Sequence, residues 1–183
     1  IESSHAVAYG IKLAQMAYEH YDELKPVEVD AVKAATESVA VNVEHEGEHL
    51  LFQCMEIKDL HSSGKKAEAD QLAWSLGLSS CYHGNVILAR SRLGATQQRE
   101  INVLRIGPVS FTTGTYEMSS DAGIFVRKHS PFDTTFVLCA NSGYIPTANA
   151  IDNHTYEGDT TMEIRGTAEA MAEKYVEMLR KIK

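Results

Sequence analysis

The 183 residues are 44% hydrophobic and 23% charged, enough apolar material for one core of ordinary size, which excludes a largely disordered chain. The net charge is -8 at pH 7 and the lysines and arginines are scattered, so the sequence lacks the basic stripe that attracts nucleic acid. No apolar run approaches the roughly 20 residues needed to cross a bilayer, and we expect no transmembrane segment.

Apolar residues recur at helical spacing near the N-terminus. Over residues 4 to 24 the steps between them alternate between four and three, which predicts an amphipathic helix with one side on a core. Pro26 ends this pattern. Because the chain starts at Ile1 and enters the helix at once, we expect the natural chain to begin upstream, and localisation stays open. The stripe consists of Val7, Ile11, Ala14, Tyr18 and Tyr21.

The next seventy residues mix both kinds of pattern. Valines alternate with polar residues at 27–29 and at 39–43, as in half-buried strands. The apolar run 50–57 fits either a strand or a helix. After a polar break, helical spacing predicts helices over 67–78 and 85–93.

From Ile101 onward strand patterns return. The runs 101–106 and 109–111 are separated by the turn dipeptide Gly107-Pro108, which predicts a hairpin. Ser119 and Ser120 precede a short helix that Ser130-Pro131 ends.

The last third completes the fold prediction. The β-branched run 134–140 is typical of a central strand, and residues 167–182 form an amphipathic pattern. We therefore predict an α+β (mixed α/β) fold with a mixed β-sheet packed with helices, in a single domain over residues 1–183. The inward residues of the last helix are Ala168, Met171, Tyr175, Met178 and Ile182.

One short motif matches the pattern of zinc peptidases. His45-Glu46-Gly47-Glu48-His49 has the H-E-x-x-H spacing, whose chemistry needs both imidazoles on one face of a helix. The preceding valines are strand-patterned and Gly47 weakens a helix, so we predict a solvated turn here. A peptidase would require His45 and His49 one turn apart on a helix.

The other reactive side chains have ordinary interpretations. Cys54, Cys81 and Cys139 are an odd number at wide spacing, and we expect three buried thiols. Cys81 lies two residues from His83, but catalytic pairs are assembled in space, so we interpret this segment as a loop. Asn153-His154-Thr155 is a glycosylation triplet of a kind that arises often by chance.

Several unusual residues after position 130 come at fixed intervals. Ser130-Pro131-Phe132 is followed by a strand, then by the segment 141–147 with sequence NSGYIPT, then by Tyr156-Glu157-Gly158. This arrangement resembles the neutral ceramidases and their shorter bacterial relatives, in which a strand ends in an Asn/Gly-rich turn, a tyrosine and later a second tyrosine with Glu-Gly. The interval from Tyr144 to Tyr156 is similar to the family interval. The likeness extends over most of the chain, as the C-terminal part of a larger, two-part catalytic domain.

The resemblance implies a catalytic zinc ion held by two histidines, a glutamate and a tyrosine, with a metal-bound water that attacks an amide carbonyl. By matched position, Glu117 and Tyr144 would be metal ligands and Tyr156 would stabilise the oxyanion. The residues before Glu117 are Thr115 and Tyr116, where the family has a Pro-Gly pair. None of the eight histidines lies in a matching motif, so we expect the two histidine ligands outside this chain.

The expected function is a metal-dependent amide (N-acyl) hydrolase acting on a small-molecule N-acyl or lipid-like amide. It would be active only together with an N-terminal part of the same protein. The alternative is a non-catalytic fragment of the same fold that binds a ligand or a partner. In either case a chain that lacks core neighbours exposes apolar surface, so we also expect self-association.

Overall fold

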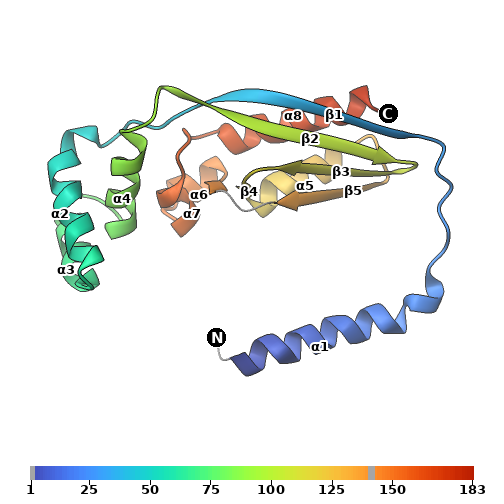
Figure 1. Cartoon of the computed structure of the whole chain (residues 1–183), viewed down its shortest axis with the longest axis horizontal. Coiled ribbons are helices and arrows are strands. Elements are labelled where there is room, and N and C mark those ends of the chain that lie inside the picture. Colours follow the sequence, from blue (N-terminus) through green and yellow to red (C-terminus); the bar gives the residue numbers. More distant parts are fainter. Residues whose placement is uncertain (1–2, 140–142) are drawn as a thin grey trace.

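A computed structural model describes residues 3–139 and 143–183, and it has the predicted α+β architecture, a mixed sheet packed with helices (Figure 1). The strands are β1 (Val32–Asn42), β2 (Thr96–Ile106), β3 (Val109–Gly114), β4 (Glu117–Met118), β5 (Thr134–Cys139) and β6 (Tyr144–Ile145). The α-helices are α1 (Ser3–Glu19), α2 (Leu51–Ser62), α3 (Lys66–Ser75), α4 (Cys81–Arg90), α5 (Ser120–His129), α6 (Ala148–Asp152), α7 (Tyr156–Thr160) and α8 (Thr167–Lys181), with 3-10 turns η1 (Tyr21–Glu23) and η2 (Glu48–Leu50).

The main sheet has the order β1-β2-β3-β5, with the first three strands antiparallel and β5 parallel to β3. The predicted hairpin at Gly107-Pro108 is confirmed as the β2–β3 turn. Gly107 has φ +56°, and a Cβ there would lie 2.7 Å from the carbonyl oxygen of Glu28. Only glycine therefore lets residues 28–31 run close under this turn.

One face of the sheet carries the larger core, which α5 and α8 cover. The five residues predicted to face inward from the last helix are all buried. Inside this core the hydroxyls of Tyr116 and Tyr175 are hydrogen-bonded at 2.7 Å, and burial raises the pKa of Tyr175 to about 12. Each buried hydroxyl thus has the other as its hydrogen-bond partner in an otherwise apolar layer.

The opposite face of the sheet is open. Ala34, Leu104, Phe111 and Phe136 stand side by side across the four strands, and the last two rings stack at 5.3 Å. Among the described strands β5 is an edge strand of the sheet, so the prediction of a central strand was wrong. Its apolar residues are divided between the two faces, because Val137 packs on the core while Phe136 is 49% exposed.

Helices α2, α3 and α4 form a second unit at one end of the sheet, which we call the helical lobe (residues 48–90; Figure 1). The apolar run 50–57 is the start of this lobe and is helical. Its hydrophobic core is built from Cys54, Ile57, Ala69, Ala73, Leu78, Cys81, Ile87 and Leu88. The lobe therefore buries its own apolar residues and does not share the core beneath the sheet.

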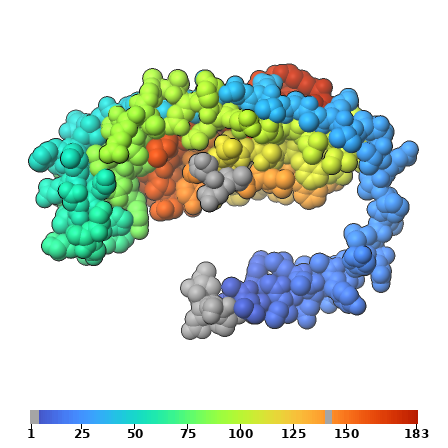
Figure 2. Space-filling model, in the orientation of Figure 1, coloured from blue at the N-terminus to red at the C-terminus, as the bar shows by residue number. Residues whose placement is uncertain are grey.

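Helix α1 stands apart from the rest of the molecule (Figures 1 and 2). All residues from His5 to Asp30 are exposed, so the predicted stripe does not lie on a core, contrary to expectation. Residues 27–29, predicted to be a strand, are an irregular connection. None of the described helices is long and apolar enough to span a membrane.

Deleting residues 1–24 tests the isolation of α1. Because residues 5–24 are exposed, we expect the thermal midpoint of unfolding to change by no more than about 2 °C. Self-association, measured by sedimentation velocity, should decrease, because the deletion removes exposed Val7, Ile11 and Tyr18. A drop of the midpoint by several degrees would show that α1 packs on the molecule in solution.

The junction of α3 and α4 yields a pH-dependent prediction. Asp70 is paired with Lys66 at 2.5 Å and accepts the Cys81 N–H at 2.9 Å, and these contacts lower the pKa of Asp70 to about 2. The ionised carboxylate therefore stabilises the fold above about pH 4, and this contribution is lost as the pH falls toward 2. We expect Asp70→Asn to lower the unfolding free energy by about 1–2 kcal/mol at pH 7 in urea titrations.

The difference between Asp70→Asn and wild type should shrink toward zero at pH 2. Glu68→Gln is the matched control, since that side chain lies on the same helix but is 58% exposed. A destabilisation that stays the same from pH 7 to pH 2 would refute the role given to the charge.

Candidate functional site

The candidate site is built on the short parallel pair β4–β6. Glu117 pairs with Tyr144 in register, and the Glu117 N–H donates to the Gly143 carbonyl at 2.9 Å. The next residue on β6, Ile145, is completely buried and fixes the strand to the core. Because paired residues point to the same side of a sheet, the carboxylate and the phenol project together.

Both side chains line one pocket of about 390 Å³ beside the N-terminal end of α5. The described lining includes the acidic residues Glu117, Asp121 and Glu157 and no lysine, arginine or histidine. The charge of Glu117 is the largest cause that raises the pKa of the Tyr144 phenol. The pocket therefore has a negative field, which favours a cation.

Tyr156 lies beside this pocket, at the start of α7, but is not among the residues that line it. It is the first residue of that helix, and its ring lies edge-on to the Tyr144 ring with centroids 5.9 Å apart. Its neighbours in the chain, Thr155 and Glu157, line the pocket. The structure thus brings together the three residues that the sequence singles out, although their chemical roles stay predictions.

The local sequence explains why α7 starts at Tyr156. His154 has φ +49°, which ends α6, and the Thr155 side chain caps α7 by accepting the Gly158 N–H at 3.2 Å. A Cβ on Gly158 would lie 2.5 Å from the carbonyl oxygen of Ala150, so only glycine allows α7 to pack this closely on α6.

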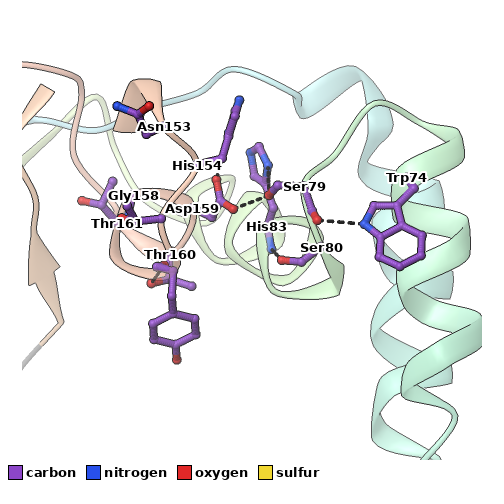
Figure 3. Close-up of polar contacts among 12 residues, drawn as sticks. Trp74, Ser79, Ser80, His83, Asn153, His154, Gly158, Asp159, Thr160 and Thr161 are labelled. Carbon is purple, nitrogen blue, oxygen red and sulfur yellow. Dashed lines mark hydrogen bonds and ion pairs between the residues drawn. The ribbon is translucent and has the colours of Figure 1, made fainter. Parts of the chain in front are cut away.

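A polar network holds the other side of α7 (Figure 3). The buried Asp159 carboxylate accepts a short hydrogen bond from the Ser79 hydroxyl and lies 3.1 Å from Nδ1 of His154. The Ser79 hydroxyl also lies 3.3 Å from Nδ1 of His83, whose pKa is lowered by burial. These contacts join the helical lobe to α7.

This network was not predicted from the sequence. Ser79 and Asp159 are 80 positions apart and neither belongs to a motif. The available signal was Ser80 before an apolar segment, which is typical of a helix cap, and Ser80 does cap α4. That signal places the start of the helix but not its distant partner.

The remaining reactive residues are placed as follows. His45 lies before the turn at Gly47 and His49 lies within η2, so no helix carries both. The predicted turn is confirmed, but it is only partly solvated, since His45, Gly47 and Glu48 are half-buried. Cys54 and Cys81 are buried as expected, whereas Cys139 is exposed.

Two further sequence predictions concern the Cys81 segment and the family-like motif. Cys81 begins α4, so that segment is a helix start where we expected a loop, and burial raises the pKa of the Cys81 thiol. Asn141 and Ser142 of the family-like motif, and Ala140 before them, lie outside the described residues.

Zinc is compatible with the donors that this chain supplies. Carboxylate oxygen is a common zinc ligand, the phenol of Tyr144 offers a second oxygen beside it, and the negative pocket suits a cation. Within residues 3–139 and 143–183, no three His, Cys, Asp or Glu side chains stand close enough to hold a metal. If Glu117 and Tyr144 held a zinc ion, they would supply two of the four ligands of a tetrahedral site.

Comparisons with known proteins do not place the chain in a family. No protein-family profile matches the sequence, and no curated protein matches it. Among solved structures there is a weak similarity to a ceramidase complexed with C2, with 21% identity and a TM-score of 0.40. The similarity covers 46% of this chain and 14% of that ceramidase, so the site must be judged on its own geometry.

The pKa of the Tyr144 phenol tests whether the Glu117 carboxylate lies beside it. Replacing Glu117 by Gln removes the charge that raises the pKa of Tyr144 most, so we expect this pKa to fall toward the usual value of about 10. The tyrosinate absorbance measures this titration, and Tyr144→Phe assigns the signal.

Glu157→Gln is the matched control for this titration. Its charge also raises the pKa of Tyr144 but is the smallest contributor, so the change should be smaller than for Glu117→Gln. Equal shifts in the two variants would contradict the larger effect given to Glu117.

Proposed function

We propose that this chain supplies part of the active site of a zinc-dependent amide hydrolase of the neutral-ceramidase type. The observation that carries the proposal is the pairing of Glu117 with Tyr144 in an acidic pocket, with the Tyr156 ring against the Tyr144 ring. The order and spacing of the two tyrosines, taken from the sequence, support the same assignment.

In this proposal Glu117 and Tyr144 hold the zinc ion through oxygen. A zinc ion supplies Lewis acidity, which polarises an amide carbonyl and lowers the pKa of water toward about 7. The Glu117 charge raises the pKa of Tyr144 and so favours the neutral phenol, whereas a cation in the pocket would favour the phenolate and offset that effect.

Tyr156 has a different task. Tyr156 is 53% exposed, and in this proposal its hydroxyl meets a substrate beside the pocket. As a neutral donor it hydrogen-bonds the oxygen on which negative charge develops when the amide carbonyl is attacked. Removal of one such donor costs about 100- to 1000-fold in turnover.

Two parts of the proposal rest on the resemblance alone. The substrate is a small N-acyl or lipid-like amide, and the two histidine ligands come from an N-terminal part of the same protein. The chain of 183 residues is then the C-terminal part of a catalytic domain and is inactive by itself. Its own two ligands should bind zinc only weakly.

The test uses the full-length product of the gene that encodes this chain. We expect about one zinc per chain by elemental analysis and release of fatty acid or amine from a panel of N-acyl substrates. A chelator should abolish turnover and added zinc should restore it. Glu117→Gln and Tyr144→Phe should lose both zinc and turnover, whereas Tyr156→Phe should keep zinc and lose about 100-fold in kcat.

Matched controls are Tyr18→Phe and Glu68→Gln, because both side chains are exposed and lie away from the pocket. A full-length product with no zinc and no amide hydrolysis would support the alternative, a non-catalytic fragment that binds a ligand or partner. Loss of zinc in the control variants would also contradict the assignment.

A further inference from the structure

A row of tyrosines connects the helical lobe to the site. The ring of Tyr82, on α4, lies edge-on to Tyr156 with centroids 5.6 Å apart and an angle of 84° between the planes. Tyr156 in turn lies edge-on to Tyr144. One continuous row therefore runs from α4 through α7 to β6, and each contact has the geometry that aromatic pairs prefer.

Tyr82 is itself held from several directions. The Lys66 ammonium lies 5.3 Å from the centre of its ring, and the ring of His61 packs edge-on at 5.4 Å. Lys66 is fixed by Asp70, which also accepts the N–H of Cys81, the residue before Tyr82. Both the backbone and the ring of Tyr82 are thus anchored within the lobe.

The segment of the lobe around Tyr82 contacts α7 at a second point. Ser79 lies three residues before Tyr82 and binds Asp159, three residues after Tyr156 (Figure 3). Helix α7 has only five residues and Tyr156 is half exposed, so the helix alone cannot fix the ring. The orientation of Tyr156 depends on contacts from the lobe.

We infer that Tyr82 is a positioning residue that sets the orientation of the Tyr156 ring, and with it the place of the Tyr156 hydroxyl. The catalytic part of this inference rests on the proposed function; the structural part does not. A donor to a developing oxyanion works only at the right place, and an error of about 1 Å can cost about 100-fold. The helical lobe then acts on the site through a ring that need not touch substrate.

The structural part is tested in the 183-residue chain by fluorine NMR after incorporation of 3-fluorotyrosine, with Tyr→Phe variants to assign each signal. In Tyr82→Leu the Tyr156 signal should move toward that of Tyr18, which is 83% exposed. In Tyr82→Phe, which keeps the ring, it should stay in place. The signals of Tyr116 and Tyr175, buried beneath the sheet, should not move in either variant.

An unchanged Tyr156 signal in Tyr82→Leu overturns the inference. If that variant fails to fold, the Tyr116 and Tyr175 signals also collapse. The test is then made on the wild-type chain, by measuring the nuclear Overhauser effect between the rings of Tyr82 and Tyr156. Its presence supports the contact, and its absence overturns it.

The catalytic part is tested in the full-length product. Tyr82→Leu should lower kcat about 10- to 100-fold with KM and zinc content little changed, and Tyr82→Phe should restore kcat. If no substrate is hydrolysed but the Tyr156 signal moves, the proposed function fails and the positioning contact stands. If hydrolysis is observed and Tyr82→Leu leaves kcat unchanged, the positioning role fails and the proposed function stands.

Discussion

The parallel pairing of β4 with β6 is the contact on which the candidate site depends. It is only two residues long, yet it places the Glu117 carboxylate beside the Tyr144 phenol, where the carboxylate charge raises the pKa of that phenol. So short a pair is not stable alone. It persists because Ile145 is completely buried and because Thr161 donates its hydroxyl to the Tyr144 carbonyl at 3.0 Å.

Thr161 also explains how the two units of the molecule meet at the site. Its carbonyl accepts two hydrogen bonds from the buried Arg90 at the end of α4, and its hydroxyl also contacts the Glu163 carboxylate, which pairs with Arg99 of β2. One residue therefore joins β6, the helical lobe and the main sheet. Since buried charged groups are costly unless partnered, these hydrogen bonds and the ion pair favour one relative placement of the lobe and the sheet. The orientation of Tyr156 depends on that placement.

The sequence predicts those parts of the fold that local pattern controls. Helix α8 has a regular apolar stripe over four turns, and all the residues predicted to face inward are buried, although the buried side is wider than predicted and also includes Ala172, Val176 and Leu179. The same argument fails for α1, because periodicity shows an apolar side but not what covers it. In the same way, the β-branched run 134–140 indicates a strand but not its place in the sheet. Glu117, Tyr144 and Tyr156 were singled out through the resemblance of the sequence to a known family, whereas Ser79, Tyr82 and Asp159 meet only through tertiary packing.

The most direct test of the central claim is to locate zinc in crystals of the full-length protein by anomalous diffraction at the zinc absorption edge. The account predicts one strong peak with a Glu117 carboxylate oxygen and the Tyr144 phenol oxygen at about 2.0–2.2 Å, and two histidine nitrogens from outside residues 1–183 completing a tetrahedron. A zinc peak elsewhere, or a fully loaded protein with no peak between Glu117 and Tyr144, would contradict it.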